Sequence, residues 1–558
     1  MIRWSHELAD GEADGRQPLT RFFGGPPLSV IFRLILLSIL IGVILKVLGL
    51  DPLNIIRSIE DLVRAIWDMG FDALVWLWRY FLLGAVVVVP IWLIVRMMRA
   101  AKGTVTTPAP LMADPSSRPS VISNARVFAI ASPAMLANLT TPLLGIVGTA
   151  VIGRLGEAHL LGGVAMSALV FDCLFWLFGF LRMGTVALTA QATGARDLIE
   201  QRAVLMRALL IAAVIGLLLI ALQVPVAAAA YGALGSSEAV RAAAETYFFV
   251  RVWSAPCALA NFAVLGWLIG IARAGTALVL QIAINTVNIV FTVLLVLVLD
   301  YGIAGAAAAA LIAEASGLAI GLVMARYRLG GHLRTDAALV LQRDKLVRML
   351  AINRDIMIRT AALIAAFAFF TAQGARAGDV ALAANAVLHN FILVGSFFLD
   401  GLATAAEQLC GRSAGARDGA AFRQAARRVL AWGLIFGAAT TILFLGVGAP
   451  LIDAMTTSAE VRQAARQFML FAALAPVMGV AAYTFDGIYI GATWARDMRN
   501  LMVIALLIYL ATWWALREYG NSGLWMALLV FLVARGALQA ARYPALVRAT
   551  FGASARTD

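Results

Sequence analysis

Long apolar stretches, each followed by a short polar segment rich in arginine, make up the chain after residue 120. Each stretch is close to the ~20 residues that a helix needs to cross a hydrocarbon core, and none has the alternating pattern of a strand. The sequence therefore predicts twelve membrane-spanning helices. They cover residues 126–152, 161–187, 203–230, 243–272, 275–299, 303–325, 346–372, 380–409, 427–448, 464–491, 499–516 and 523–546.

One of these stretches recurs in the second half of the chain. Leu160–Asp197 and Ala381–Asp418 are both long and sparsely polar, and both end in Gly-Ala-Arg-Asp, at positions 221 residues apart. Such a repeat indicates a duplicated unit, which is how many secondary transporters are built. Because six helices is an even number, two six-helix halves have the same orientation in the membrane.

A separate unit precedes this duplication. Residues 1–110 contain two further spans, at 28–50 and near 71–95, joined by an amphipathic stretch. We expect a two-helix transmembrane hairpin, and its sequence resembles small uncharacterised two-span bacterial membrane proteins. A proline-rich segment then marks a linker at 111–120. The predicted lobes are an N-lobe at 121–335 and a C-lobe at 336–558.

Composition supports a polytopic membrane protein. Of the 558 residues, 62% are hydrophobic and 13% are charged, and the mean hydropathy is +0.89. The net charge of +13 comes from arginines in the short loops. Arginines in such loops usually set the membrane topology and contact lipid headgroups, so they do not indicate nucleic-acid binding. The isolated cysteines Cys173, Cys257 and Cys410 have no metal-binding spacing and are interpreted as packing residues.

The distribution of the basic residues predicts the orientation. They concentrate after spans 2, 6, 8 and 10, whereas the intervening loops carry one or two each. By the positive-inside rule, the arginine-rich loops and both chain termini are cytoplasmic. We therefore expect a multi-pass protein of the bacterial inner membrane, and we expect it to be a monomer.

Ionisable groups inside spans are costly, so each is a functional candidate. A buried carboxylate is suited to taking up and releasing a proton, because desolvation raises its pKa and a nearby cation lowers it. With amide or hydroxyl oxygens around it, the same group can instead hold Na⁺. The carboxylates nominated for ion coupling are Asp172, Glu314, Asp400, Glu407 and Asp486. Asp355 is interpreted instead as an in-helix ion pair with Arg359, four residues on.

Neutral polar residues in the same spans are candidates for a substrate cavity. Amides of this kind more often join helices than bind substrate, and a lone histidine is more often a packing residue than a proton relay. The nominated residues are Asn138, Asn261, Asn285, Asn288, Thr292, His389 and Asn390. No phosphate-binding loop, paired-histidine motif or nucleophile elbow is present, so we expect neither an enzyme nor an ATP-driven pump, and no resident metal or cofactor.

Several of these segments resemble one known family. They are the residues 132–156, 161–165, 180–197, 254–274, 350–360, 399–418 and 485–500, in order along both halves. They are similar to the DinF-like branch of the MATE family, the multidrug and toxic compound extrusion transporters. The resemblance covers about residues 121–548. It implies an all-helical fold of twelve spans in two lobes with a central cavity, and efflux of organic compounds driven by H⁺ or Na⁺.

Two positions depart from the family pattern. The acid expected in the first span, before Thr-Ala-Val-Ile-Gly, is replaced by Gly148, and a second acid expected in the fifth span is replaced by Thr292. We hypothesise that Asp172, on the adjacent helix, takes over from them with help from Glu314. Alternatively, the C-lobe acids Asp400, Glu407 and Asp486 carry the coupling.

The leading interpretation is a cation-coupled antiporter, with H⁺ favoured over Na⁺, that exports cationic or amphipathic organic compounds by alternating access. One alternative is a flippase for a lipid-linked precursor, which would require a strongly cationic central cavity. Another is a membrane scaffold without transport activity, in which the amino-terminal hairpin recruits a partner.

Overall fold

The computed structural model describes residues 122–331 and 336–552. The predicted hairpin within residues 1–110 and the linker at 111–120 lie outside these residues. The described part is helical and contains no strand. Eleven of its helical segments are long and apolar enough to cross a membrane, and a further helix of 30 residues lies where the first span was predicted.

Each predicted span of the two lobes coincides with one long helix or with consecutive shorter helices. The helices of the N-lobe are α5 (Asn124–Gly153), α6 (Ala158–Leu177), α7 (Phe180–Gly194), α8 (Leu198–Ala221), α9 (Gln223–Leu234), α10 (Glu238–Arg251), η1 (Val252–Ser254), α11 (Ala255–Gly270), α12 (Ala274–Val293), η2 (Leu294–Val298) and α13 (Gly302–Arg328). After α14 (Ala337–Val340), the helices of the C-lobe are α15 (Arg343–Arg376), α16 (Asp379–Gly415), α17 (Gly419–Met455), α18 (Ala459–Gly491), α19 (Ala495–Ala515), η3 (Arg517–Tyr519) and α20 (Gly520–Phe551).

Three N-lobe spans are broken where their C-lobe counterparts are continuous. The second predicted span breaks between α6 and α7 at Phe178 and Gly179. The third predicted span breaks between α8 and α9 at Leu222, whereas its counterpart α17 is one helix. The fourth breaks at η1, immediately before Pro256 in the first turn of α11. Proline suits a first helical turn, where its missing N–H leaves no hydrogen bond unmade, and it disfavours continuation of the preceding helix.

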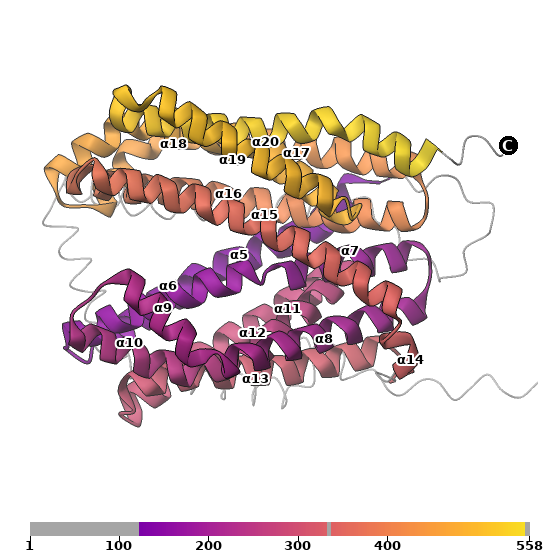
Figure 1. Ribbon diagram of the computed structural model, residues 1–558, viewed down its shortest axis with the longest axis horizontal. Coiled ribbons are helices and arrows are strands. Elements are labelled where there is room, and N and C mark those ends of the chain that lie inside the picture. The colour runs from indigo at the N-terminus through magenta and orange to yellow at the C-terminus, as the bar shows by residue number, and fades with distance from the viewer. Residues whose placement is uncertain (1–121, 332–335, 553–558) are drawn as a thin grey trace, which may run out of the picture. The chain divides into compact units, whose positions relative to one another are not determined.

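Within the N-lobe, α11 lies in the centre and packs against α7, α8 and α13. α10 packs against α6 and α13, and α12 packs against α13 (Figure 1). α11 is the most buried of these helices because it is surrounded on nearly every side, and its buried residues include Asn261, Gly266 and Trp267.

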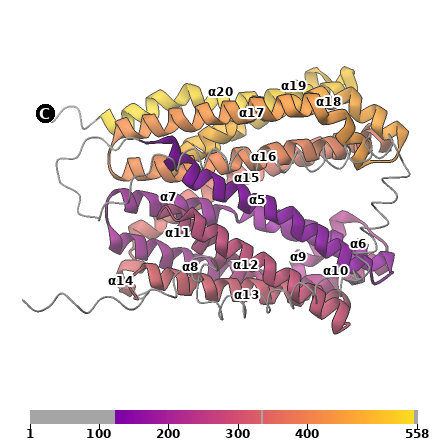
Figure 2. The same cartoon turned by 180° about the vertical axis from the view of Figure 1, so that it is seen from behind.

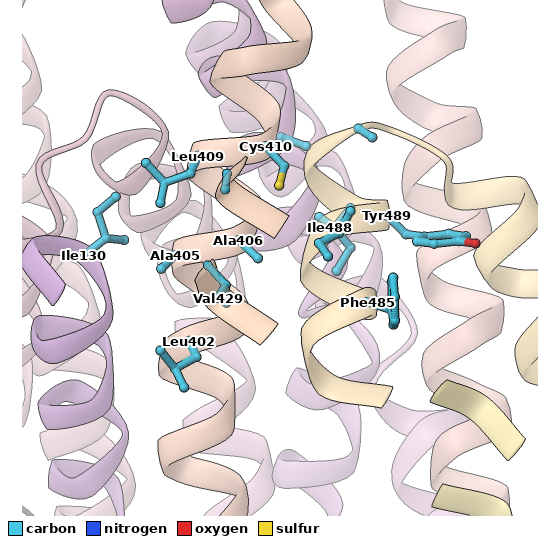
Figure 3. Close-up of a cluster of buried hydrophobic side chains, with 14 of the residues drawn as sticks. Ile130, Leu402, Ala405, Ala406, Leu409, Cys410, Val429, Phe485, Ile488 and Tyr489 are labelled. Carbon is cyan, nitrogen blue, oxygen red and sulfur yellow. The ribbon is translucent and has the colours of Figure 1, made fainter. Parts of the chain in front are cut away.

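Within the C-lobe, α18 takes the equivalent central position and packs against α16, α17 and α20. α15 lies against α19, and α19 lies against α20. Figure 3 shows part of the core at the end of this lobe that carries the turn after α16. Leu402 and Leu409 lie on the side of α16 that faces Ile130 of α5, whereas Cys410 lies on the side that faces Ile488 of α18, and all five are buried.

The helix bounds repeat between the lobes at the 221-residue interval found in the sequence. α6 begins at Ala158 and α16 at Asp379, while α10 begins at Glu238 and α18 at Ala459. The two lobes are therefore copies of one helical unit, as the duplicated sequence predicted.

The turns between helices repeat as well. Arg196 and Arg417 have φ values of 58° and 55°, and Ala272 and Thr493 have φ values of 61° and 59°. A left-handed residue directly after a helix lets the following N–H groups bond back to the last carbonyls. Non-glycine residues adopt this conformation only at a cost, and it recurs at equivalent positions of both lobes.

The lobes meet where α7 crosses α16. A Cβ on Gly415 would collide with the carbonyl oxygen of Gln191, and a Cβ on Gly194 would collide with that of Arg412. The two helices approach so closely because only glycine leaves the space.

Side-chain amides join the lobes beside this crossing. The Gln191 amide donates to the carbonyl oxygen of Gly491 at 3.0 Å. The Gln408 amide donates to the carbonyl oxygen of Gly270 at 3.4 Å. Gly270 and Gly491 occupy equivalent positions in the repeat, so each lobe's crossing helix bonds to the end of the other lobe's central helix.

α5 belongs to both lobes. Its first half packs against α16, and its second half packs against α12. In Figure 2 the indigo helix runs obliquely from the C-lobe helices toward the N-lobe helices. Phe128 meets Trp432 of α17 with ring centroids 4.8 Å apart, whereas Thr140 accepts a hydrogen bond from Asn285 of α12 at 2.9 Å. α5 thus connects the lobes along one side of the interface.

We expect Gly415→Val to destabilise this closed crossing by about 1–3 kcal/mol, the usual cost of overpacking. The new side chain would force α16 away from Gln191. Cross-linking by a short bifunctional thiol reagent between cysteines introduced at Gln191 and Thr493, whose Nε2 and Oγ1 atoms are 3.3 Å apart, measures the closed state and should fall. The matched control is Gly446→Val, because a Cβ there meets no atom within 4 Å. Equal cross-linking in both variants would contradict the expected close packing.

Candidate functional site

One face of α16 points toward the N-lobe along most of its length. We call it the interlobe face; its residues follow one another at helical spacing and are Ala386, Asn390, Leu393, Phe397, Asp400, Thr404, Glu407 and Gly411. Two contacts fix its direction. The Asn138 amide of α5 donates to the Phe397 carbonyl at 3.3 Å, and a Cβ on Gly411 would lie 2.9 Å from the Cβ of Ala190 in α7.

The interlobe face changes from exposed to buried at Asp400. Asn390, Leu393 and Asp400 are exposed, whereas every residue from Gly401 to Gly411 is buried. Asp400 therefore marks the level at which the two lobes close upon each other, and Glu407 lies two helical turns further into the closed part.

Arg182 of α7 faces these two acids from the other lobe. Its guanidinium interacts electrostatically with both Asp400 and Glu407, but it forms no ion pair with either at contact distance. Arg182 belongs to the N-lobe and the two acids belong to the C-lobe, where Arg359 of α15 also acts on both acids. The attraction to Arg182 therefore acts across the interface.

Glu407 is the more enclosed of the two acids. Its residue is 3% exposed, and within the described part of the chain its Oε2 atom has no hydrogen-bond partner. A buried ionised carboxylate without hydrogen bonds is costly, and binding of a proton or a cation would remove that cost.

Asp486 is fully paired instead. One of its carboxylate oxygens accepts from Arg359 and, at 2.7 Å, from Arg535, while the other accepts from Gln539 at 2.7 Å. All four residues are buried, and they come from α15, α18 and α20. We call this group the Asp486 cluster. It joins three helices inside the C-lobe.

The ion pair predicted between Asp355 and Arg359 is wrong. Asp355 pairs with Arg499 of α19 at 2.7 Å and with its neighbour Arg354 at 3.1 Å. Arg359 reaches Asp486 because the interior of the C-lobe offers it a buried acid. Four-residue spacing on a helix permits a pair, but tertiary neighbours decide it.

Asp172 occupies the position in the N-lobe that Leu393 occupies on the interlobe face. Leu169, Asp172 and Trp176 are exposed on α6. At the 221-residue interval they correspond to Asn390, Leu393 and Phe397 of the interlobe face. α6 also contacts α15 of the other lobe. By this correspondence Asp172 faces the space between the lobes.

An arginine links the two N-lobe acids. Arg251 interacts electrostatically with both Asp172 and Glu314. Its guanidinium donates to the Tyr247 hydroxyl at 2.5 Å and lies 5.0 Å from the ring centroid of Phe171. Glu314 in turn accepts from the Asn261 amide at 2.7 Å. The structure thus brings Asp172, Glu314 and Asn261 into one network centred on Arg251.

The other predicted cavity residues are not brought together with these acids. Asn285 accepts from Gln281 at 3.0 Å and donates to Thr140 of α5. Thr292 donates to Asn288 within α12 at 3.2 Å. Asn390 donates to Ala386 one turn earlier at 2.9 Å. In this conformation these amides bond to neighbouring helix groups.

His389 packs against an aromatic ring. Its ring centroid lies 5.5 Å from that of Phe367 in an edge-on arrangement. Gly148, where the family pattern has an acid, faces open space, because a Cβ there would meet nothing within 4 Å. An acid at this position would therefore fit sterically.

The arginines of these networks were not among the candidate site residues predicted from the sequence. Arg182, Arg251, Arg359 and Arg535 all lie within or beside predicted spans, where a cation is as costly as an acid. That signal was available in the sequence. The sequence did not indicate which acid each arginine contacts, because these acids are distant in the chain.

The chain matches known families in both of its parts. Residues 133–294 and 356–514 match the family model MatE. DNA damage-inducible protein F of Escherichia coli (strain K12) is 39% identical over 421 residues, which cover 74% of this chain and 90% of that protein. The chain belongs to the MATE family. Residues 66–101, in the predicted amino-terminal unit, match a domain of unknown function, DUF6460.

More distant MATE relatives share most of the chain. The Arabidopsis thaliana protein DETOXIFICATION 44, chloroplastic, is 26% identical and covers 73% of this chain and 80% of its own length. Among solved structures, a MATE protein in the bent conformation gives a TM-score of 0.71 at 16% identity, covering 77% of this chain and 97% of its own.

Two further structures share the fold. A MOP superfamily transporter from Pyrococcus furiosus, described as having a binding pocket of reverse polarity, gives a TM-score of 0.70 at 16% identity and covers 76% of this chain and 96% of its own. A mutant of the Vibrio cholerae MATE transporter VcmN gives 0.69 at 20% identity, covering 76% and 97%.

Family membership confirms the predicted fold class and the broad function. This MATE protein is a multi-pass membrane transporter of small molecules and not an enzyme. Within residues 122–331 and 336–552, twelve long helical segments form the two six-helix lobes expected from the resemblance.

Proposed function

We propose that this MATE protein is a proton-coupled antiporter of the bacterial inner membrane, and that it exports cationic or amphipathic organic compounds. The single observation that carries the proposal is the pair Asp400 and Glu407 on the interlobe face, opposite Arg182 of the other lobe. Ionised, the two acids attract Arg182 and hold the lobes together at this end. Protonation removes that attraction, and the lobes separate.

Proton coupling fits Glu407 better than sodium coupling. A proton needs one carboxylate oxygen, and Glu407 has a buried oxygen without a partner among the described residues. Na⁺ needs several oxygen ligands at once. The charged groups that act on Glu407 include two guanidiniums, Arg182 and Arg359, which cannot serve as cation ligands.

The order of events follows from which end is closed. The closed crossing at Gly194 and Gly415 lies directly before the arginine-containing turns at Arg196 and Arg417, which the positive-inside rule assigns to the cytoplasm. The conformation is then open to the outside. Protons arriving from outside neutralise Asp400 and Glu407, the cytoplasmic end opens, and an organic cation is taken up there in exchange for the released protons.

Asp172 and Asp486 have different roles in this proposal. Asp172, exposed beside Arg251, is a second proton or substrate site in the N-lobe, in line with its predicted replacement of the acid missing at Gly148. Asp486 has both oxygens engaged by buried donors, and we interpret it as a structural group rather than a coupling group.

Transport into proteoliposomes tests this function. An outward-directed organic cation flux, measured with a fluorescent dye, should respond to an imposed pH gradient and not to a sodium gradient. Asp172→Asn should lower pH-driven transport about tenfold or more, within the 5- to 150-fold range of typical coupling. The matched control, Asp300→Asn, replaces an exposed acid in a turn. Transport driven by sodium alone would overturn the proposal.

The lipid-linked precursor flippase is the second candidate, and the arginines favour it. Four guanidiniums, those of Arg182, Arg251, Arg359 and Arg535, accompany the acids of the two lobes, and the P. furiosus relative is described as having a pocket of reverse polarity. Translocation of a fluorescent lipid-linked pyrophosphate in the same liposomes, without dye transport, would support this second function.

A further inference from the structure

A cavity of about 400 Å³ lies at the end of the C-lobe, away from the interlobe acids. It is formed by the start of α17 and the end of α20, and Arg417, Arg423 and Arg548 line it. These elements pack closely, since the rings of Phe422 and Phe551 have centroids 5.1 Å apart. We call this cavity the arginine pocket.

The three arginines of the pocket have no protein partner among the described residues. All three side chains are exposed, and none forms a hydrogen bond or an ion pair there. Other exposed arginines nearby do, for example Arg542, which lies 3.0 Å from Asp497. Asp418, the acid next to Arg417 in the chain, accepts instead from the Ala421 N–H at 2.8 Å and caps α17.

None of these three arginines is paired within the described chain, and the single carboxylate of Asp418 at the start of α17 leaves the charge around the pocket positive. Like charges held around one cavity repel each other, so a bound anion would stabilise the arrangement. Arginine presents its donors as a planar fork that suits phosphate and carboxylate oxygens.

The wall of the pocket is apolar. Val547 is buried at 7% exposure, and Ala420 and Phe551 complete this side. A small hydrated anion gains nothing from such a wall, whereas an amphipathic phosphate ester does. Basic pockets between helices at the cytoplasmic face are suited to anionic lipid headgroups.

We propose that the arginine pocket binds a phosphate ester. The phosphate group has two sources, the headgroup of an anionic phospholipid in the membrane and a soluble phosphate compound. The phosphate lies between Arg417, Arg423 and Arg548, and the glycerol and the first acyl carbons lie against Val547 and Phe551.

Titration of the purified full chain in detergent tests the site. The probes are short-chain phosphatidylglycerol, short-chain phosphatidylcholine and inorganic phosphate, and binding is read from native mass spectra and from the shift in melting temperature. We expect the triple variant Arg417→Gln/Arg423→Gln/Arg548→Gln to bind phosphatidylglycerol about a hundredfold more weakly, since each basic residue near a lipid surface contributes roughly a fivefold effect.

Two further variants keep the result interpretable. The control triple Arg326→Gln/Arg328→Gln/Arg343→Gln removes the same charge from exposed positions of other helices and should bind as the unaltered chain does. Ala420→Trp fills the pocket while keeping every arginine, and it should also abolish binding, including in the event that the first triple variant fails to fold.

The three probes separate the possible sources. Binding of phosphatidylglycerol alone supports the lipid headgroup, and binding of inorganic phosphate that the pocket variants lose supports a soluble phosphate ester. Equal affinity for phosphatidylglycerol and phosphatidylcholine, or undiminished binding in the filled variant, would overturn the proposal.

Discussion

Asp486→Ala should lower the free energy of unfolding by about 3–5 kcal/mol, the cost of leaving buried charges without their partner. Removal of this carboxylate leaves the guanidiniums of Arg359 and Arg535 buried without a negative partner, since their side chains are 7% and 2% exposed. It also takes the acceptor from the Gln539 amide. Loss of the native state during heating in detergent, followed by size-exclusion chromatography, measures the change.

Two comparisons make this result specific. Asp453→Ala breaks an ion pair of 2.6 Å with Arg466, which is 51% exposed, and should cost no more than about 1 kcal/mol. The triple variant Asp486→Leu/Arg359→Met/Arg535→Met removes all three charges and should recover most of the lost stability. A change in Asp486→Ala as small as that in Asp453→Ala would show that the Asp486 cluster does not hold the C-lobe together.

Glu407→Gln should strongly reduce proton-driven transport while leaving the fold intact, provided that the interlobe acids carry the coupling. Glutamine has the same shape but stays neutral, so it mimics the protonated acid permanently. The attraction to Arg182 is weakened, and the closed end depends less on pH because only Asp400 still titrates opposite this arginine. We expect coupled transport to fall by about 5- to 150-fold, measured as pH-driven dye flux in proteoliposomes.

A structural assay on the same variant separates coupling from damage. Cross-linking between cysteines introduced at Gln191 and Thr493 should decrease with falling pH when Glu407 is present and should respond less to pH in Glu407→Gln. The control Glu460→Gln removes an exposed acid from the start of α18 and should retain both responses. Normal transport in Glu407→Gln would move the coupling to Asp172 and the N-lobe.

The sequence by itself determined the helices and their duplication. Every predicted span of the two lobes overlaps a helix or a pair of consecutive helices, because a segment that crosses a bilayer must be apolar over a fixed length and must satisfy its backbone internally. The repeat of Gly-Ala-Arg-Asp likewise placed the two equivalent turns, since a turn after a helix is specified by residues that are neighbours in the chain.

The sequence also nominated the acids of the candidate site, because any carboxylate in a span stands out against an apolar background. It could not rank them. Asp486 and Glu407 are both single carboxylates in apolar spans. Asp486 accepts hydrogen bonds from three donors, whereas one buried oxygen of Glu407 has no hydrogen-bond donor in the described chain.

Only the tertiary structure decided the partners. Arg359 pairs with Asp486 at a separation of 127 residues rather than with Asp355 in its own helix, and Arg182 faces acids more than 200 positions away in the other lobe. Helical periodicity says which residues share a face, but it says nothing about which faces meet. The packing of the helices and the crossing at Gly194 and Gly415 brought these charges together, and those contacts are set by the fold as a whole.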